Sequence, residues 1–230
     1  VAFFDVKARS TAEMTDTVTD VGTELGVTGD EGPESFDTVN PDSGESIETS
    51  MHLKKAQISL TMYPGSNGLI PNPFLTIATD ENTLAAKANG QPAQGSAVRS
   101  AFVELVEQLS VALNPVFVSS FSTAHATAGP APKVVTPTEV PIDLDRIPWL
   151  GIYSESILPQ FGGRKRVLET PAWRVDELEN GSILVITTEE PWANYGSKHP
   201  ADHYLLNGDD NAKQESMEST LSDPFGALEP

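Results

Sequence analysis

The sequence predicts an α+β protein in which a few helices pack on an antiparallel or mixed sheet. Two stretches, residues 10–26 and 96–113, have apolar side chains at the spacing of one helix face. Several short apolar or alternating runs are bounded by glycine, proline and asparagine, as β-strands are. In the first half the order strand, strand, helix, strand is typical of a helix that packs across a sheet. The strands and helices form two related α+β blocks.

Composition and patterning divide the chain, which we expect to be one compact domain overall, into six consecutive segments. They are an N-terminal strand and helix (1–26), an acidic mobile loop (27–50), a first α+β block (51–126), a Pro-rich connector (127–147), a second α+β block (148–206) and an acidic tail (207–230).

The N-terminal segment predicts a strand over residues 2–6 and then a helix. Ser10 is the expected N-cap of this helix, and Glu13 completes a capping box. Gly26 ends it. The loop that follows is rich in Gly, Pro, Asp, Glu and Ser, with too little apolar surface to order it. The predicted buried face of the helix consists of Met14, Val18, Val21 and Leu25.

The first block contains two predicted strands, residues 53–63 and 74–78, then a helix and a third strand over 116–121. The helix begins at Ser96 as its N-cap and stops at Asn114–Pro115, because the residue before a proline avoids the helical conformation. Its buried face consists of Val98, Phe102, Leu105, Val106, Leu109 and Leu113.

The second block predicts a strand over residues 149–153 and a short helix from Ser154 to Phe161. A β-hairpin follows, in which 173–178 pairs with 182–187 across Asn180–Gly181, a dipeptide that favours a two-residue turn. We expect Trp149, Trp173 and Val185 to lie together on the inner face of one sheet. Residues after 207 have few apolar side chains, so we expect a disordered tail.

The charge is strongly negative and lies mainly at the two ends of the chain. There are 14 Lys and Arg against 33 Asp and Glu, a formal net charge of −19. Residues 1–50 and 176–230 each carry a net charge of −10, whereas residues 51–175 carry +1. Such a chain repels nucleic-acid phosphates, so direct nucleic-acid binding is not expected. Three interpretations explain the excess: halophilic adaptation, solvated acidic tails, or an acidic surface for a basic partner.

Other features exclude several classes of function. There is no cysteine, which excludes disulfides, thiol catalysis and Cys-ligated metal sites. No apolar run approaches the about 20 residues that cross a bilayer, so we expect no membrane association and a cytoplasmic location. The oligomeric state is left open.

Three short motifs could carry chemistry, and we favour a plain structural interpretation of each. His199, Asp202 and His203 form an H-x-x-D-H cluster, but its flanks resemble a surface loop. Asp143–Leu144–Asp145 lacks a nucleotide-binding context. Gly162–Gly163 before Arg164–Lys165–Arg166 fits a glycine helix cap better than a phosphate nest. We therefore predict no catalytic residues, no metal and no cofactor.

The segment from Pro148 to Trp192, which includes "LETPAWRVDELENGSILVITTEEPW", resembles the C-terminal part of polymorphic-toxin and type VI immunity proteins. In these proteins a Trp/Tyr strand ending in Ser precedes a short helix and a hairpin with a glycine-containing turn. An acidic-Pro-aromatic corner follows, here Glu189–Glu190–Pro191–Trp192. The helix over Val98–Leu113 is similar to the preceding part of the pattern, so the resemblance covers about residues 51–195.

The resemblance implies a non-enzymatic α+β protein that binds and neutralises a cognate toxin effector. Toxins that cut nucleic acid tend to be basic, and an acidic inhibitor gains association rate from complementary charge. The expected partner is therefore a basic protein. The expected partner-binding residues are the acids of the hairpin and of the corner after it: Glu177, Glu179, Glu189 and Glu190. The alternatives are a structural component of a virion or extracellular appendage and a halophilic protein of unknown binding function.

Overall fold

The strands in the described part of the chain form one antiparallel sheet. The computed structural model describes residues 2–5, 11–26, 28–29, 47–53, 56–63, 74–79, 92–120, 144, 146–193 and 198–207. Predictions for the middle of the acidic loop, for most of the connector and for the tail after 207 lie outside these residues.

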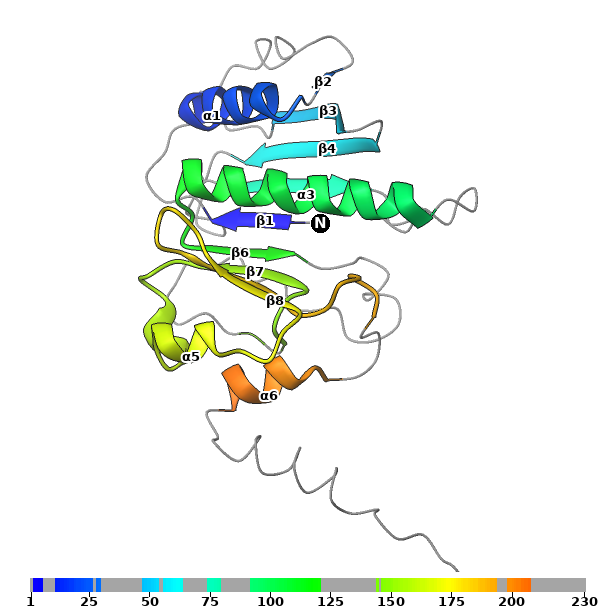
Figure 1. Ribbon diagram of the computed structural model, residues 1–230. Helices are drawn as coiled ribbons and strands as arrows, with labels where there is room; N and C mark the ends of the chain where they lie inside the picture. The colour runs from blue at the N-terminus through cyan, green and yellow to red at the C-terminus, as the bar shows by residue number, and fades with distance from the viewer. Residues whose placement is uncertain are drawn as a thin grey trace, which may run out of the picture.

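Nine strands of the described residues run in the order β2-β3-β4-β5-β1-β6-β7-β9-β8 (Figure 1). Every neighbouring pair is antiparallel. The predicted α+β class is thus confirmed, and the two expected blocks share one sheet because β6 pairs with β7. The strands are β1 (Ala2–Asp5), β2 (Thr28–Gly29), β3 (Ile47–Leu53), β4 (Ala56–Tyr63), β5 (Phe74–Thr79), β6 (Phe117–Ser120), β7 (Leu150–Tyr153), β8 (Arg174–Glu177) and β9 (Ile183–Ile186).

Two long helices, α1 (Thr11–Glu24) and α3 (Pro92–Leu113), pack against each other and cover one face of the sheet (Figure 1). Their predicted apolar faces are buried, from Met14 and Val18 in α1 to Leu109 and Leu113 in α3. The opposite face of β6, β7 and β9 is covered by three short helical elements. These are the 3-10 helix η4 (Leu158–Phe161), α5 (Arg164–Leu168) and α6 (Pro200–Leu206).

The sheet therefore has a core on each face in its C-terminal half. In β9, Leu184 and Ile186 face the α1–α3 core, whereas Ile183 and Val185 face the second core. A strand that is covered on both sides is apolar throughout, which explains why all four residues are buried. The expected single inner face is wrong: Trp149 and Val185 are both buried, but they belong to different cores.

Several boundaries differ from the predicted ones. The single strand expected over 53–63 belongs to a hairpin of two strands. Leu53 ends β3, which begins at Ile47, and β3 pairs along its whole length with β4. β2 and the start of β3 thus lie in the segment expected to be a mobile loop. α3 begins at Pro92 rather than Ser96, because proline is well tolerated at a helix N-terminus. Ser154 begins a turn before η4 rather than a continuous helix.

The predicted hairpin around Asn180–Gly181 is confirmed, but its turn is longer than the expected two residues, because Leu178 and Ser182 are still hydrogen bonded and three residues, 179–181, lie between them. Gly181 has a φ of 81°, which glycine adopts without strain, and the Leu178 N–H donates to Ser182 O at 2.8 Å. The Asn180 side chain donates to Ser110 O at 3.0 Å and accepts from the Ser182 N–H at 3.1 Å. The turn between β8 and β9 is therefore held against the C-terminal end of α3.

Candidate partner-binding site

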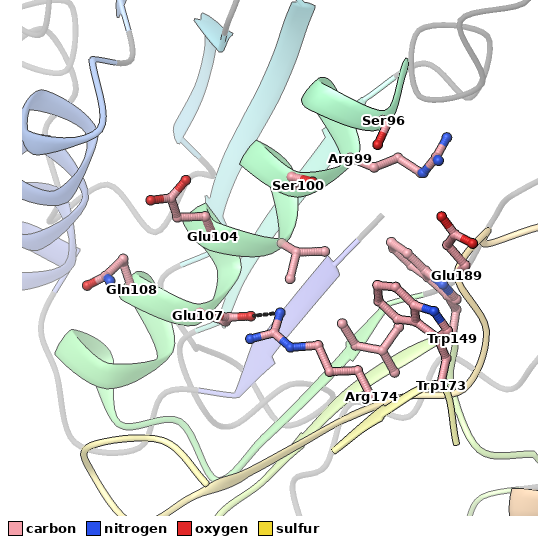
Figure 2. Close-up of a pocket in the computed structure, with 12 residues that line it drawn as sticks. Ser96, Arg99, Ser100, Glu104, Glu107, Gln108, Trp149, Trp173, Arg174 and Glu189 are labelled. Atoms are coloured by element: carbon pink, nitrogen blue, oxygen red, sulfur yellow. Dashed lines mark hydrogen bonds and ion pairs between the residues drawn. The ribbon is translucent and has the colours of Figure 1, made fainter. Parts of the chain in front are cut away.

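A cleft of about 370 Å³ lies between α3 and one end of the strands β7, β9 and β8 (Figure 2). Its two sides come from segments that are far apart in the sequence. The residues that line it are Ser96, Arg99, Ser100, Val103, Glu104, Glu107, Gln108, Trp149, Trp173, Arg174, Ile186 and Glu189.

One wall of the cleft is a stripe along α3. Ser96, Ser100, Val103 and Glu107 follow each other at spacings of four, three and four residues, so they share one helix face. This stripe lies beside the apolar stripe that packs on the sheet. Its first two side chains are small hydroxyls, which leave room above the sheet. The α3 wall is therefore polar and open toward its N-terminal half.

The opposite wall is formed where the strands β7, β8 and β9 have neighbouring ends. Trp149 precedes β7 and Trp173 precedes β8, whereas Glu189 follows β9. Because β9 is antiparallel to both of its neighbours, its end lies beside their beginnings. The register confirms this, since Ile186 is paired with both Leu150 and Arg174.

The two tryptophans of this wall differ in burial. Trp149 is only 8% exposed, and its indole N–H donates to Thr188 O at 2.8 Å. Trp173 is 55% exposed, although its backbone N–H donates to Thr187 O at 3.1 Å. The expectation that Trp173 is a core residue is wrong. It precedes β8, the last strand in the order of the described sheet, and its ring lines the cleft (Figure 2).

An ion-pair network joins the two walls. The Arg174 guanidinium donates to Glu107 Oε1 at 2.7 Å across the cleft and also pairs with Asp176 on the same strand. Burial raises the pKa of Glu107, and the attraction of Arg174 only partly offsets this. Burial alone would lower the pKa of Arg174, but Glu107 and Asp176 outweigh it and raise that pKa above its ordinary value. Arg174 therefore stays charged and is neutralised within the protein.

At the mouth of the cleft, Arg99 lies over the ring of Trp192, with 5.7 Å between the guanidinium carbon and the ring centroid. The indole N–H of Trp192 donates to Glu190 Oε2 at 2.7 Å. The lining residues thus include three carboxylates, on Glu104, Glu107 and Glu189, and two guanidinium groups.

The four predicted partner-binding acids fall in two places. Glu189 is exposed and lines the cleft, and Glu190 is held next to it by Trp192. Glu177 forms an ion pair with Arg164 toward the other end of the hairpin, and Glu179 is exposed beside the turn. The structure brings only Glu189 into the lining of the cleft. Trp173, Arg174 and the α3 stripe were missed, because alternation along β8 does not show which residues of α3 lie opposite.

The H-x-x-D-H cluster caps a helix. His199 is the N-cap of α6 and accepts a hydrogen bond from the Ala201 N–H at 3.1 Å. Asp202 accepts from the N–H groups of His199 at 2.7 Å and Ile147 at 2.6 Å. The expected loop is wrong because Pro200 occupies the first turn of α6, where its missing N–H has no cost. Burial lowers the pKa of His199, although Asp202 opposes this shift.

The glycine cap predicted at Gly162 is confirmed. Gly162 has a φ of 83° and closes η4 with its N–H donated to the preceding turn. The basic residues after it belong to α5 and are used inside the fold. Arg164 donates to Gly181 O at 3.0 Å, and Arg166 donates to Tyr204 O at 3.1 Å. Asp143 and Asp145 lie outside the described residues.

Two further properties of the described residues bear on the kind of site they form. Within these residues, no group of three or more His, Asp or Glu side chains is arranged to hold a metal ion. None of the described helices has both the length and the apolar character needed to span a membrane.

No family model and no curated protein matches the sequence. Among solved structures, the chain is similar to a type VI secretion system (T6SS) protein of Pseudomonas aeruginosa, with a TM-score of 0.48 and 9% sequence identity. The match covers 90% of this chain and 70% of that chain.

Proposed function

We propose that the protein is a non-enzymatic immunity protein that binds a toxin effector and neutralises it, with the cleft between α3 and β8 as the binding surface. The observation that carries this proposal is the 55% exposure of Trp173 beside the cleft. The ring lines a cleft rather than standing alone on the surface, so a partner can bury it in a pocket. Tryptophan is also enriched among the few residues that dominate the energy of protein interfaces.

The surroundings of Trp173 are fixed before any partner arrives. The Trp149 indole is hydrogen bonded to a main-chain oxygen, and Arg174 is held by Glu107 and Asp176. Binding to such a surface orders few side chains, so less of the interaction energy is lost to entropy. These fixed groups support a surface that recognises one specific partner.

The charge of the chain supports a basic partner. The net charge of −19 accelerates the approach of a cationic protein through long-range attraction. The resemblance of residues 51–195 to immunity proteins supports a toxin as that partner. The use of His199 and Asp202 as a helix cap, and of Glu107 as an ion-pair partner, supports a role without catalysis.

The test is to express the product of the adjoining open reading frame in a bacterial host, with and without this chain. We expect the product to arrest growth, the chain to restore it, and the two purified proteins to elute as one complex. Trp173→Ala should abolish rescue, whereas Glu155→Ala, an exposed control outside the cleft and outside the expected partner-binding acids, should leave it intact. A neighbouring product that is harmless, or that is toxic but neither bound nor neutralised, would contradict the proposal.

A further inference from the structure

We infer that the cleft receives an arginine side chain of the basic partner, whose guanidinium stacks on Trp173 and pairs with Glu189. This inference rests on the proposed function, since it names the group by which the partner is recognised. It follows from three properties of the cleft: an available aromatic face, an exposed carboxylate beside it, and cations that already have partners.

The aromatic face and the carboxylate lie on the same wall. Figure 2 shows Trp173, Trp149 and Glu189 grouped opposite α3. A guanidinium stacks parallel to an indole face while its N–H groups point outward in the guanidinium plane, free to donate to a carboxylate beside the ring. A lysine ammonium has no such plane. The arrangement therefore favours arginine over lysine.

The charges of the cleft favour a cation over an anion. Arg174, the cation nearest to Trp173 in sequence, is neutralised by Glu107 and Asp176. Arg99 lies over Trp192. Glu189, by contrast, is exposed and makes no ion pair within the residues that the structure describes. The lining has three carboxylates and two guanidinium groups, so one incoming guanidinium would make its positive and negative charges equal in number.

The α3 wall leaves space for such a side chain. Ser96 and Ser100 have short side chains with hydroxyl oxygens that can accept hydrogen bonds from a guanidinium. The volume of about 370 Å³ accommodates one long side chain and its neighbours rather than a folded element. The partner would therefore insert a side chain from a loop.

The inference is tested with a small probe that needs no toxin. We would titrate acetyl-Gly-Arg-Gly-amide into the full chain and follow the tryptophan indole N–H signals by NMR, with the Trp173 signal assigned through Trp173→Phe. The citrulline analogue, which has the same shape but no charge, is the control ligand. We expect a saturable shift of the Trp173 signal with the arginine peptide and a much weaker response to citrulline.

Variants localise the contact. Glu189→Gln should weaken arginine binding about fivefold, the size of an exposed ion pair, whereas Glu155→Gln, outside the cleft, should leave it unchanged. Both positions are exposed, so neither change should unfold the chain. An unmoved Trp173 signal, equal binding of citrulline, or equal effects of the two variants would overturn the inference.

The inference and the proposed function can fail separately. If the chain neutralises the toxin through Trp173 but ignores the arginine peptide, the function stands and the inference is wrong. If the peptide binds at Trp173 but no toxin is neutralised, the arginine site stands and the immunity function is wrong.

Discussion

Replacing each of the two tryptophans of the cleft by alanine should separate folding from binding. Trp149 is 8% exposed and hydrogen bonded, so Trp149→Ala removes a buried ring and should cost about 3–5 kcal/mol of unfolding free energy. Trp173 is 55% exposed, so less than half of its surface is withdrawn from water. Scaling the same truncation by this fraction gives a cost of about 1–2 kcal/mol for Trp173→Ala.

The assay is equilibrium unfolding in urea, with the free energies compared at equal slopes, followed by titration with the toxin. We expect Trp173→Ala to remain folded and to lose about 2 kcal/mol or more of binding energy, as central interface tryptophans do. If Trp173→Ala destabilised the fold as much as Trp149→Ala, the ring would be a core residue and the cleft would not be a binding surface. If its affinity matched that of the parent, the proposed site would be wrong.

Three further predictions concern stability. The Tyr153 hydroxyl is fully buried and has no hydrogen-bond partner among the described residues, and burial raises the pKa of Tyr153 well above its ordinary value of 10.0. Only the unfolded chain then ionises this tyrosine near pH 10, so stability should fall as the pH rises through that value, and Tyr153→Phe should reduce the fall without destabilising the protein at pH 7. Urea unfolding at several pH values measures this, and an unchanged alkaline loss in Tyr153→Phe would refute it. Asn180→Ala removes the hydrogen bond to Ser110 O and should cost about 1 kcal/mol, whereas Glu179→Ala, beside the same turn, should cost less than about 0.5 kcal/mol in the same assay; equal costs would contradict the role of Asn180. The melting temperature should change little between about 0.5 and 3 M KCl, because screening is already extensive near 0.15 M, where the Debye length is about 8 Å. A steep continuing rise would favour halophilic adaptation over partner binding as the reason for the acidic surface.

Local signals predicted the elements of the fold well. The helix faces of α1 and α3 follow from apolar spacing, and the β8–β9 hairpin follows from Asn180–Gly181 between two strand-forming runs. Each of these features depends on residues within a few turns or strand positions of one another. The surface loop expected around His199 was wrong for a local reason too, because Pro200 begins the helix α6 instead of interrupting it.

Features that depend on distant pairing were not predictable from the sequence. Glu107 does not belong to the predicted buried face of its helix, and nothing local shows that Arg174, 67 residues later, would reach it. The prediction for Trp173 was wrong because it assumed a single inner face shared with Trp149 and Val185. The sheet is in fact covered on both faces in this half, and β8 lies at its edge.

The cleft itself follows from a mismatch in length between a helix and the strands beneath it. α3 has 22 residues, which at about 1.5 Å per residue is roughly 33 Å, whereas β7, β8 and β9 have four residues each, roughly 13 Å at about 3.3 Å per residue. Asn180 holds the hairpin turn to the C-terminal end of α3, so the excess length lies toward the N-terminal half of the helix. There the strands have ended, and the space beneath α3 is bordered by the residues that flank them, Trp149, Trp173 and Glu189. Trp173 and Glu189 are exposed at these strand ends, unlike the buried residues of β9, so this end of the sheet can present a tryptophan and a carboxylate to a partner without loss of the core.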